Sequence, residues 1–330
     1  MKIAFFSTKS YDQLYFERAN NKQQHKFIFL EPALTENTVG LAVGCKAICV
    51  FVNDKLTAPV IQSLAQQKVE LIALRCAGFN NVDLKAAKEH NIPVVRVPAY
   101  SPHAIAEHAV ALILTLNRKT HKAYNRVRES NFSLDRLIGF DLYGKTVGVV
   151  GTGKIGSTFA GIMRGFGCTV LATDIQENKE LSKQGVQYVP IQELFEKSDI
   201  ISLHCPLTEQ TRHLINEQTL KQTKPGLMLI NTGRGVLIDT KAVTKALKTG
   251  HLGYLGIDVY EQEENLFFKD LSETIIQDDV IARLMTFPNV LITAHQAFLT
   301  EEALSEITRI TLENIDAFEK GNTLVNVVQL

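Results

Sequence analysis

The chain has 330 residues, of which 45% are hydrophobic and 21% are charged, and its 35 basic and 35 acidic side chains cancel. This composition is typical of a globular protein of about two domains, each able to bury a core. Because it holds no block of like charge, we expect no nucleic-acid or membrane partner. The apolar run at residues 3–6 is too short for a signal sequence, and no run approaches the roughly 18 residues of a membrane span. We therefore expect a cytoplasmic protein.

The first hundred residues alternate short apolar, β-branched runs with amphipathic stretches, a pattern typical of α/β units with parallel strands. The strands are expected at residues 2–7, 26–30, 47–52, 71–76 and 93–97, with helices at 59–67 and 83–90 between them.

A long helical pattern follows from residue 102 to about residue 130, opening with Pro102, which suits a first helical turn. Its first half is apolar and its second half is strongly charged. We expect one long helix there, which packs in a core and joins two domains or two subunits.

A second α/β series fills the rest of the chain. Its strands are expected at residues 145–150, 169–173, 199–204, 227–231, 254–259 and 289–294, and its helices at 157–167, 239–250 and 300–320. The sequence therefore predicts the α/β class with two doubly wound parallel-sheet domains.

The five cysteines form no C-x-x-C pair, and most lie in apolar runs. We interpret them as small buried side chains in a reducing compartment rather than as nucleophiles or metal ligands. They are Cys45, Cys49, Cys76, Cys168 and Cys205. No metal site is predicted.

A glycine-rich motif follows the strand that ends near residue 150 and opens a helical pattern. It runs Gly151, Thr152, Gly153, Lys154, Ile155, Gly156 and fits G-x-G-x-x-G. In this context the first glycine permits a tight turn, the second lets the backbone approach a pyrophosphate, and the third allows close helix–strand packing. The free N–H groups at the helix N-terminus favour phosphate there. The motif predicts a dinucleotide site.

Asp174 ends the next strand, at the spacing expected of an acid that binds a ribose. Its carboxylate can accept from both ribose hydroxyls and would repel a 2′-phosphate. The next residues, Ile175, Gln176 and Glu177, supply no arginine for such a phosphate. The cofactor is therefore predicted to be NAD rather than NADP.

Reactive side chains follow the late strands, and the carboxyl ends of parallel strands form the binding edge of a doubly wound sheet. Arg234 follows one strand, a group of glutamates at 261, 263 and 264 follows the next, and His295 follows the last. Each also has a structural interpretation: a turn arginine, solvated carboxylates and a core histidine.

Together these residues suit hydride transfer to a 2-keto acid. A histidine has an ordinary pKa of about 6.5 and can protonate a developing alkoxide, and a nearby carboxylate would hold it protonated. An arginine can bind a substrate carboxylate through two parallel hydrogen bonds.

Seven segments in the same order make the chain resemble the D-isomer-specific 2-hydroxyacid dehydrogenases, and within them the fermentative D-lactate dehydrogenases. They are ALRCAGFNNVD, VRVPAYSPHAIAEHAVALIL, GKTVGVVGTGKIG, ISLHCPLT, INTGRGVLID, GIDVYE and AHQAFLT, and they cover nearly the whole chain.

The resemblance implies a role for each matching position. Arg234 would bind substrate, His295 would be the acid/base, and Glu263, five positions after Asp258, would support it. The cofactor contacts would be Gly151, Gly153, Lys154, Ile155, Gly156, Asp174, Cys205, Pro206, Thr232, Gly233 and Asp258, the last at the nicotinamide carboxamide. The substrate contacts would be Arg234, the backbone at Ala77 and Gly78, and a small apolar pocket of Tyr100 and Phe298. His204 is left open between a cofactor contact and a structural role.

The resemblance also implies a discontinuous arrangement. Residues 102–296 would form a Rossmann NAD-binding domain, and residues 1–101 with 297–330 a flavodoxin-like substrate domain. A homo-oligomer, dimer or tetramer, would be the family habit. An added stretch at about 269–283, and the lack of proline after Glu263, resemble the lactate-type members and favour pyruvate and D-lactate as the substrate pair.

Two other functions compete with this one. The first is the same reaction on a bulkier 2-keto acid, since sequence does not fix the pocket volume. The second is a non-enzymatic, NAD-sensing corepressor, an offshoot of the family, which would favour a long disordered tail that this chain lacks.

Overall fold

A computed structural model describes residues 1–20 and 24–329 of the chain. These residues form two compact units, one of residues 1–101 with 299–330 and one of residues 102–298. The sequence predicts the second boundary two residues earlier, after residue 296.

The first unit is built on a parallel five-stranded sheet in the order β2-β1-β3-β4-β5. The strands are β1 (Lys2–Phe5), β2 (Lys26–Phe29), β3 (Ala47–Val50), β4 (Leu71–Leu74) and β5 (Val94–Val95). The helices are α1 (Ser10–Ala19), α2 (Ala58–Gln66), α3 (Leu84–Glu89), α12 (Glu301–Glu319) and the 3₁₀ turn η1 (Val39–Ala42). This strand order is that of flavodoxin-like folds, as predicted.

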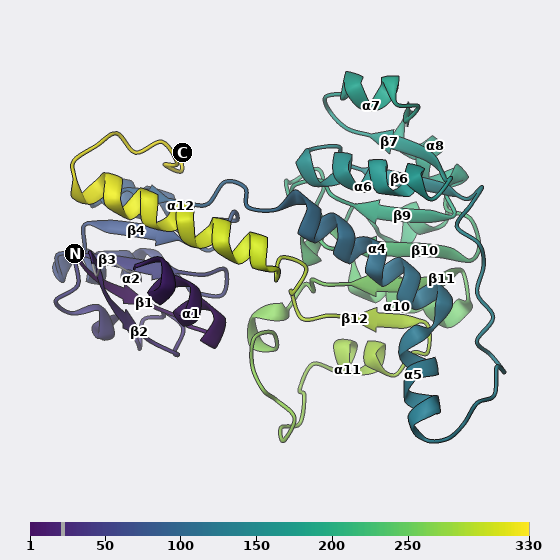
Figure 1. Cartoon of the computed structure of the whole chain (residues 1–330), viewed down its shortest axis with the longest axis horizontal. Helices are drawn as coiled ribbons and strands as arrows, with labels where there is room; N and C mark the ends of the chain where they lie inside the picture. Colours follow the sequence, from purple (N-terminus) through teal and green to yellow (C-terminus); the bar gives the residue numbers. More distant parts are fainter. Residues whose placement is uncertain (21–23, 330) are drawn as a thin grey trace. The chain divides into compact units, whose positions relative to one another are not determined.

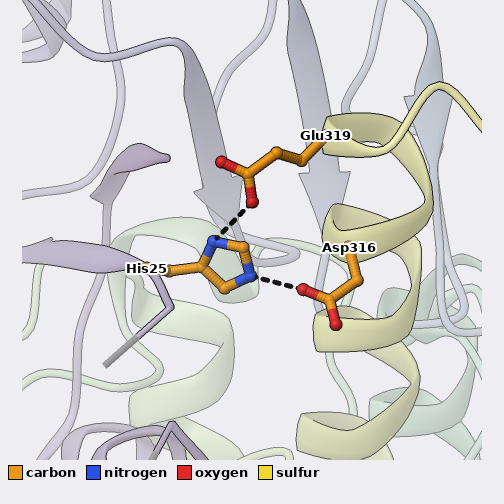
Figure 2. A group of neighbouring side chains, drawn as sticks. All are labelled: His25, Asp316 and Glu319. Carbon is orange, nitrogen blue, oxygen red and sulfur yellow. Dashed lines mark hydrogen bonds and ion pairs between the residues drawn. The ribbon is translucent and has the colours of Figure 1, made fainter. Parts of the chain in front are cut away.

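The helix at the end of the chain, α12, packs on this first sheet beside α1 and β4 (Figure 1). Its side chains Asp316 and Glu319 face the buried ring of His25, which lies just before β2 (Figure 2). His25 Nε2 lies 2.7 Å from Asp316 Oδ1, and Nδ1 lies 3.6 Å from Glu319 Oε2. These contacts tie the two ends of the sequence into one unit.

The second unit holds a parallel seven-stranded sheet in the order β12-β11-β10-β9-β6-β7-β8. The strands are β6 (Thr146–Val150), β7 (Thr169–Thr173), β8 (Gln187–Tyr188), β9 (Ile200–Leu203), β10 (Leu227–Asn231), β11 (Leu252–Ile257) and β12 (Val290–Ile292). The strand order reverses between β6 and β9, so the binding edge lies at the carboxyl ends of these two strands.

Helices cover both faces of this sheet (Figure 1). One apolar core lies under α4 (Pro102–Arg118) and α6 (Lys154–Gly165), and a second lies under α8 (Ile191–Lys197), α9 (Glu217–Leu220), α10 (Thr240–Thr249) and α11 (Asp279–Met285). The remaining elements are α5 (Thr120–Arg128), α7 (Lys179–Lys183) and the 3₁₀ turns η2 (Gly235–Leu237) and η3 (Glu263–Asn265). Both units confirm the predicted fold class.

The prediction of one helix from 102 to 130 is wrong. The chain breaks at Lys119, whose φ of 52° is left-handed, and α4 and α5 are separate helices. α5 buries none of its residues. Since no packing fixes the direction of the charged half, it need not continue the axis of the apolar half.

Within the described ranges, no helix has both the length and the apolar character needed to span a bilayer.

Candidate active site

The glycine-rich loop connects β6 directly to α6. Gly151 has φ of 90°, and a Cβ there would lie 2.5 Å from the Cys205 nitrogen. A Cβ on Gly156 would lie 1.9 Å from the Gly151 oxygen, so helix and strand meet at a distance only glycine allows. A Cβ on Gly153 would meet nothing within 4 Å, so packing does not require glycine there. Room for a ligand at this point fits the phosphates of a dinucleotide.

Asp174 follows β7 and lies beside this loop. Its Oδ2 accepts from the Thr152 nitrogen at 2.5 Å and from Thr152 Oγ1 at 3.1 Å. Burial alone would raise the pKa of Asp174, but these hydrogen bonds, with others from Gln176 and Ile175, outweigh it and the pKa is lowered. The carboxylate is ionised at neutral pH, and the residue is exposed, which suits hydrogen bonds from ribose hydroxyls.

The segments that follow β9 and β10 complete the loop's surroundings. The Thr232 hydroxyl is buried and has no hydrogen-bond partner among the described residues, an orphan that a ligand could satisfy. Gly233 is held by its N–H, which donates to Asn231 Oδ1 at 3.0 Å. Burial raises the pKa of Cys205 to about 11, so this thiol is protonated and is no nucleophile at neutral pH.

His204, beside Cys205, makes structural contacts. Its Nε2 lies 2.9 Å from Ser202 Oγ, and its ring lies 4.9 Å from that of Phe159. Burial lowers the pKa of His204 to about 3, so the ring is neutral. Of the two roles left open by the sequence, these contacts favour the structural one.

Arg234, Glu263 and His295 come from three consecutive strands of the sheet. They follow β10, β11 and β12, which are neighbours and parallel. Their connecting loops therefore leave the same edge of the sheet, the edge that also carries the glycine-rich loop after β6.

The structure brings Glu263, rather than Glu261, to the histidine. Glu263 Oε1 lies 2.9 Å from His295 Nδ1, and its Oε2 accepts from the Tyr260 nitrogen at 3.0 Å. Glu261 instead lies 2.7 Å from His213 Nε2 and accepts from Thr240. Because the carboxylate accepts from Nδ1–H, Nε2 is the ring nitrogen left to exchange a proton with a substrate.

The loop that carries His295 is held by Asp258. The carboxylate of Asp258 is buried and accepts from the nitrogens of Gln296 and Ala297 at 2.8 and 2.9 Å and from Thr293 Oγ1 at 2.5 Å. The His295 nitrogen donates to the Asp258 oxygen at 2.7 Å. His295 itself has φ of 53°, a strained conformation that these hydrogen bonds hold in place. Asp258, predicted to bind the carboxamide, has its carboxylate engaged in positioning the histidine.

Sequence reasoning missed His108, on α4. Its Nε2 lies 3.0 Å from Thr293 Oγ1 and 3.6 Å from Asp258 Oδ1. Burial lowers the pKa of His108, although Asp258 opposes this. The segment AIAEHA carries the residue, but nothing local shows a contact 185 positions away.

The arginine loop is packed closely against the glutamate loop. A Cβ on Gly235 would lie 2.1 Å from the Tyr260 carbonyl carbon, so glycine is required there. The side-chain amide of Asn231 donates to the Arg234 carbonyl at 2.9 Å. Arg234 Nη1 donates to the Gly233 oxygen at 2.8 Å, which leaves the other guanidinium nitrogens for a substrate carboxylate.

The predicted substrate residues lie in both units. In the first unit, the Ala77 oxygen accepts from Arg96 Nη1 at 2.8 Å and the Gly78 oxygen accepts from Cys76 Sγ at 3.3 Å, so this loop after β4 is fixed. Tyr100 lies one residue before the end of the first segment of that unit, and Phe298, buried at 6% exposure, is the last residue of the second unit. Their joint role in one substrate site remains a prediction.

Comparison with known proteins identifies the family of the chain. Residues 110–297 match the family described as D-isomer specific 2-hydroxyacid dehydrogenase, NAD binding domain. The chain belongs to this family. It is therefore an NAD-dependent dehydrogenase of 2-hydroxyacids, as predicted.

Similar proteins resemble the chain over its full length. The D-lactate dehydrogenase of Escherichia coli is 52% identical over 326 residues, which cover 99% of each chain, and its solved apo-structure has a TM-score of 0.92 with 100% of both chains covered. A structure described as the pyruvate reductase of Chlamydomonas reinhardtii has a TM-score of 0.93 at 46% identity, covering 99% of this chain and 98% of that one. A D-2-hydroxyisocaproate dehydrogenase has a TM-score of 0.85 at 34% identity, with 99% of each covered.

Proposed function

We propose that this enzyme reduces pyruvate to D-lactate with NADH, and that Arg234, Glu263 and His295 carry the reaction. The observation that carries the proposal is the hydrogen bond between Glu263 and His295 at the sheet edge that holds the dinucleotide loop. An imidazole paired with a carboxylate is a proton donor suited to a developing alkoxide.

Each residue has one task in this proposal. The glycine-rich loop and Asp174 would hold NADH, which would supply the hydride for the keto carbon. Arg234 binds the substrate carboxylate and polarises the carbonyl. His295 donates the Nε2 proton to the carbonyl oxygen as it gains charge, and Glu263 stabilises the protonated ring through Nδ1. In lactate oxidation the same groups act in reverse.

The first unit, residues 1–101 with 299–330, is proposed as the substrate domain. Its fixed loop at Ala77 and Gly78 would offer backbone N–H groups to the substrate carboxylate, and Tyr100 with Phe298 would enclose the methyl group of pyruvate. The NAD-binding domain would be residues 102–298.

A bulkier 2-keto acid is the second candidate, because a structural neighbour is a D-2-hydroxyisocaproate dehydrogenase. The higher identity to the D-lactate dehydrogenase favours pyruvate. Comparing kcat/KM for pyruvate with branched-chain and aromatic keto acids tests the choice. We expect pyruvate to be best by about tenfold or more. A higher kcat/KM for a branched acid would overturn the assignment, and no turnover of any keto acid would favour the NAD-sensing corepressor.

We further propose that the enzyme works as a homo-oligomer in the cytoplasm. Apolar side chains stand exposed along the segment that follows α5, where Phe132 is 73%, Leu134 is 80% and Ile138 is 84% exposed. Such a cluster is typical of a surface that a second copy covers. Among the described residues no disulfide joins two cysteines, which is compatible with a reducing compartment. Light scattering of the purified enzyme tests the oligomer.

A further inference from the structure

A cavity of about 570 Å³ lies in the second unit, beside the edge strand β12 and away from the dinucleotide loop. Its walls are apolar and come from β12, from α11 and from the residues of the added stretch before α11. The side chains that form these walls include Ile276, Ile281, Met285, Phe287 and Ile292. A volume of this size falls in the range of small-molecule sites, roughly 300–1,000 Å³.

The polar side chains that line the cavity are basic or neutral. They include His121 and Lys122, at the start of α5, and Lys269, whereas none of the residues lining the cavity is an aspartate or glutamate. The Lys122 ammonium lies at the rim, where it donates to the Pro288 oxygen. The His121 ring interacts with the Thr115 backbone and so belongs to the cavity wall. An apolar cavity with a cationic rim is complementary to a ligand with an apolar body and one anionic head.

We propose that this cavity binds an amphipathic monocarboxylate, a molecule with one carboxylate and an apolar body of roughly eight carbon atoms. The carboxylate would meet Lys122 at the rim, and the body would lie against Ile276, Met285 and Phe287. This site is separate from the proposed pyruvate site.

The cavity adjoins the backbone of both catalytic partners. The nitrogens of Leu266 and Phe267, which line it, donate to the Glu263 oxygen at 3.0 and 2.9 Å. Thr293 and Ala294, which also line it, directly precede His295. An occupant therefore contacts the segments that hold the Glu263–His295 pair.

The test is a titration of the full-length enzyme with octanoate, read from the methyl signals of its four methionines, with methyl-¹³C methionine incorporated. Met285 is the one methionine that lines the cavity. We expect its signal to shift in a saturable way, with a dissociation constant of about a millimolar or less, while Met163 and Met228 in the sheet core do not move. The neutral analogue octanol should bind about tenfold more weakly.

Matched variants show whether octanoate binds in this cavity or elsewhere on the enzyme. Lys122→Gln should weaken octanoate about tenfold, whereas Lys119→Gln, on a neighbouring lysine outside the cavity, should not. Arg234→Lys should leave the Met285 shift intact, since the active site is not involved. The proposal fails if the Met285 signal does not respond to octanoate, if octanol binds as well as octanoate, or if both lysine variants behave alike. It also fails if the Met285 signal changes with protein concentration, because a second copy would then fill the cavity.

Discussion

Replacing Glu263 by glutamine removes the charge that faces His295 while keeping the side chain's shape. The two side chains are 23% and 18% exposed, so water screens their interaction only in part. A charge-assisted hydrogen bond contributes about 1.5–3 kcal/mol. A glutamine has one acceptor oxygen for the two donors, His295 Nδ1 and the Tyr260 nitrogen, that the carboxylate serves. If that stabilisation is needed while the alkoxide forms, kcat should fall by about 10- to 150-fold.

The assay is the steady-state oxidation of NADH with saturating pyruvate, together with a separate measurement of NADH binding. Glu261→Gln is the matched control, because Glu261 contacts His213 and Thr240 instead of the catalytic histidine. We expect it to keep kcat within about threefold. Equal losses in both variants, or an unchanged kcat in Glu263→Gln, would refute the assignment of Glu263 as the partner of His295.

Other substitutions test the remaining parts of the site. Arg234→Lys should raise KM for pyruvate far more than it changes NADH binding, because an ammonium cannot form two parallel hydrogen bonds. If Arg234 only shapes the loop, steady-state kinetics would show a smaller effect on KM for pyruvate than on NADH binding. Asp174→Ala should raise kcat/KM with NADPH relative to NADH, and an unchanged ratio would mean that another residue reads the ribose. Gly156→Ala should destabilise the second unit by about 2–3 kcal/mol in a denaturant titration, whereas Gly153→Ala should keep stability and weaken NADH binding. The pKa of His204 is about 3 in the folded protein and about 6.5 in the unfolded chain. Its contribution to the free energy of unfolding is therefore complete above pH 6.5 and is lost as the pH falls toward 3. The unfolding free energy should therefore fall more steeply below pH 6, by up to about 1.4 kcal/mol per pH unit, than in His204→Asn, and parallel curves would contradict this.

Local patterns predict most of the strands and the cofactor loop. The strand at 227–231 and the helix capped by Asp239 and Gly250 are found where expected, because burial and capping are written in neighbouring residues. The glycine motif is equally local, since the close approach of Gly156 to Gly151 depends on residues five positions apart.

Contacts between residues far apart in the sequence account for most of the features that local patterns do not predict. The break at Lys119 carries no glycine or proline signal. α11 begins at an N-cap, Asp278, whose carboxylate accepts from the nitrogens of Val280 and Ile281. The added stretch therefore does carry a local signal for the start of this helix. The position of His108 against Thr293 depends on α4 crossing the sheet, which no local pattern contains.

The choice of Glu263 over Glu261 also depends on contacts between distant residues. Both follow β11 in one acidic run. Which of them pairs with His295 and which with His213 depends on where those histidines lie in the fold. From the residues alone the run is ambiguous, and the family resemblance supplied the assignment.

Chiral analysis of the product is the most decisive single measurement. The purified enzyme is supplied with pyruvate and NADH, and the lactate formed is resolved by chiral chromatography. We predict D-lactate in amounts equal to the NADH consumed, and its loss in His295→Gln while NADH binding persists. L-lactate, or undiminished turnover in that variant, would contradict the proposed reaction.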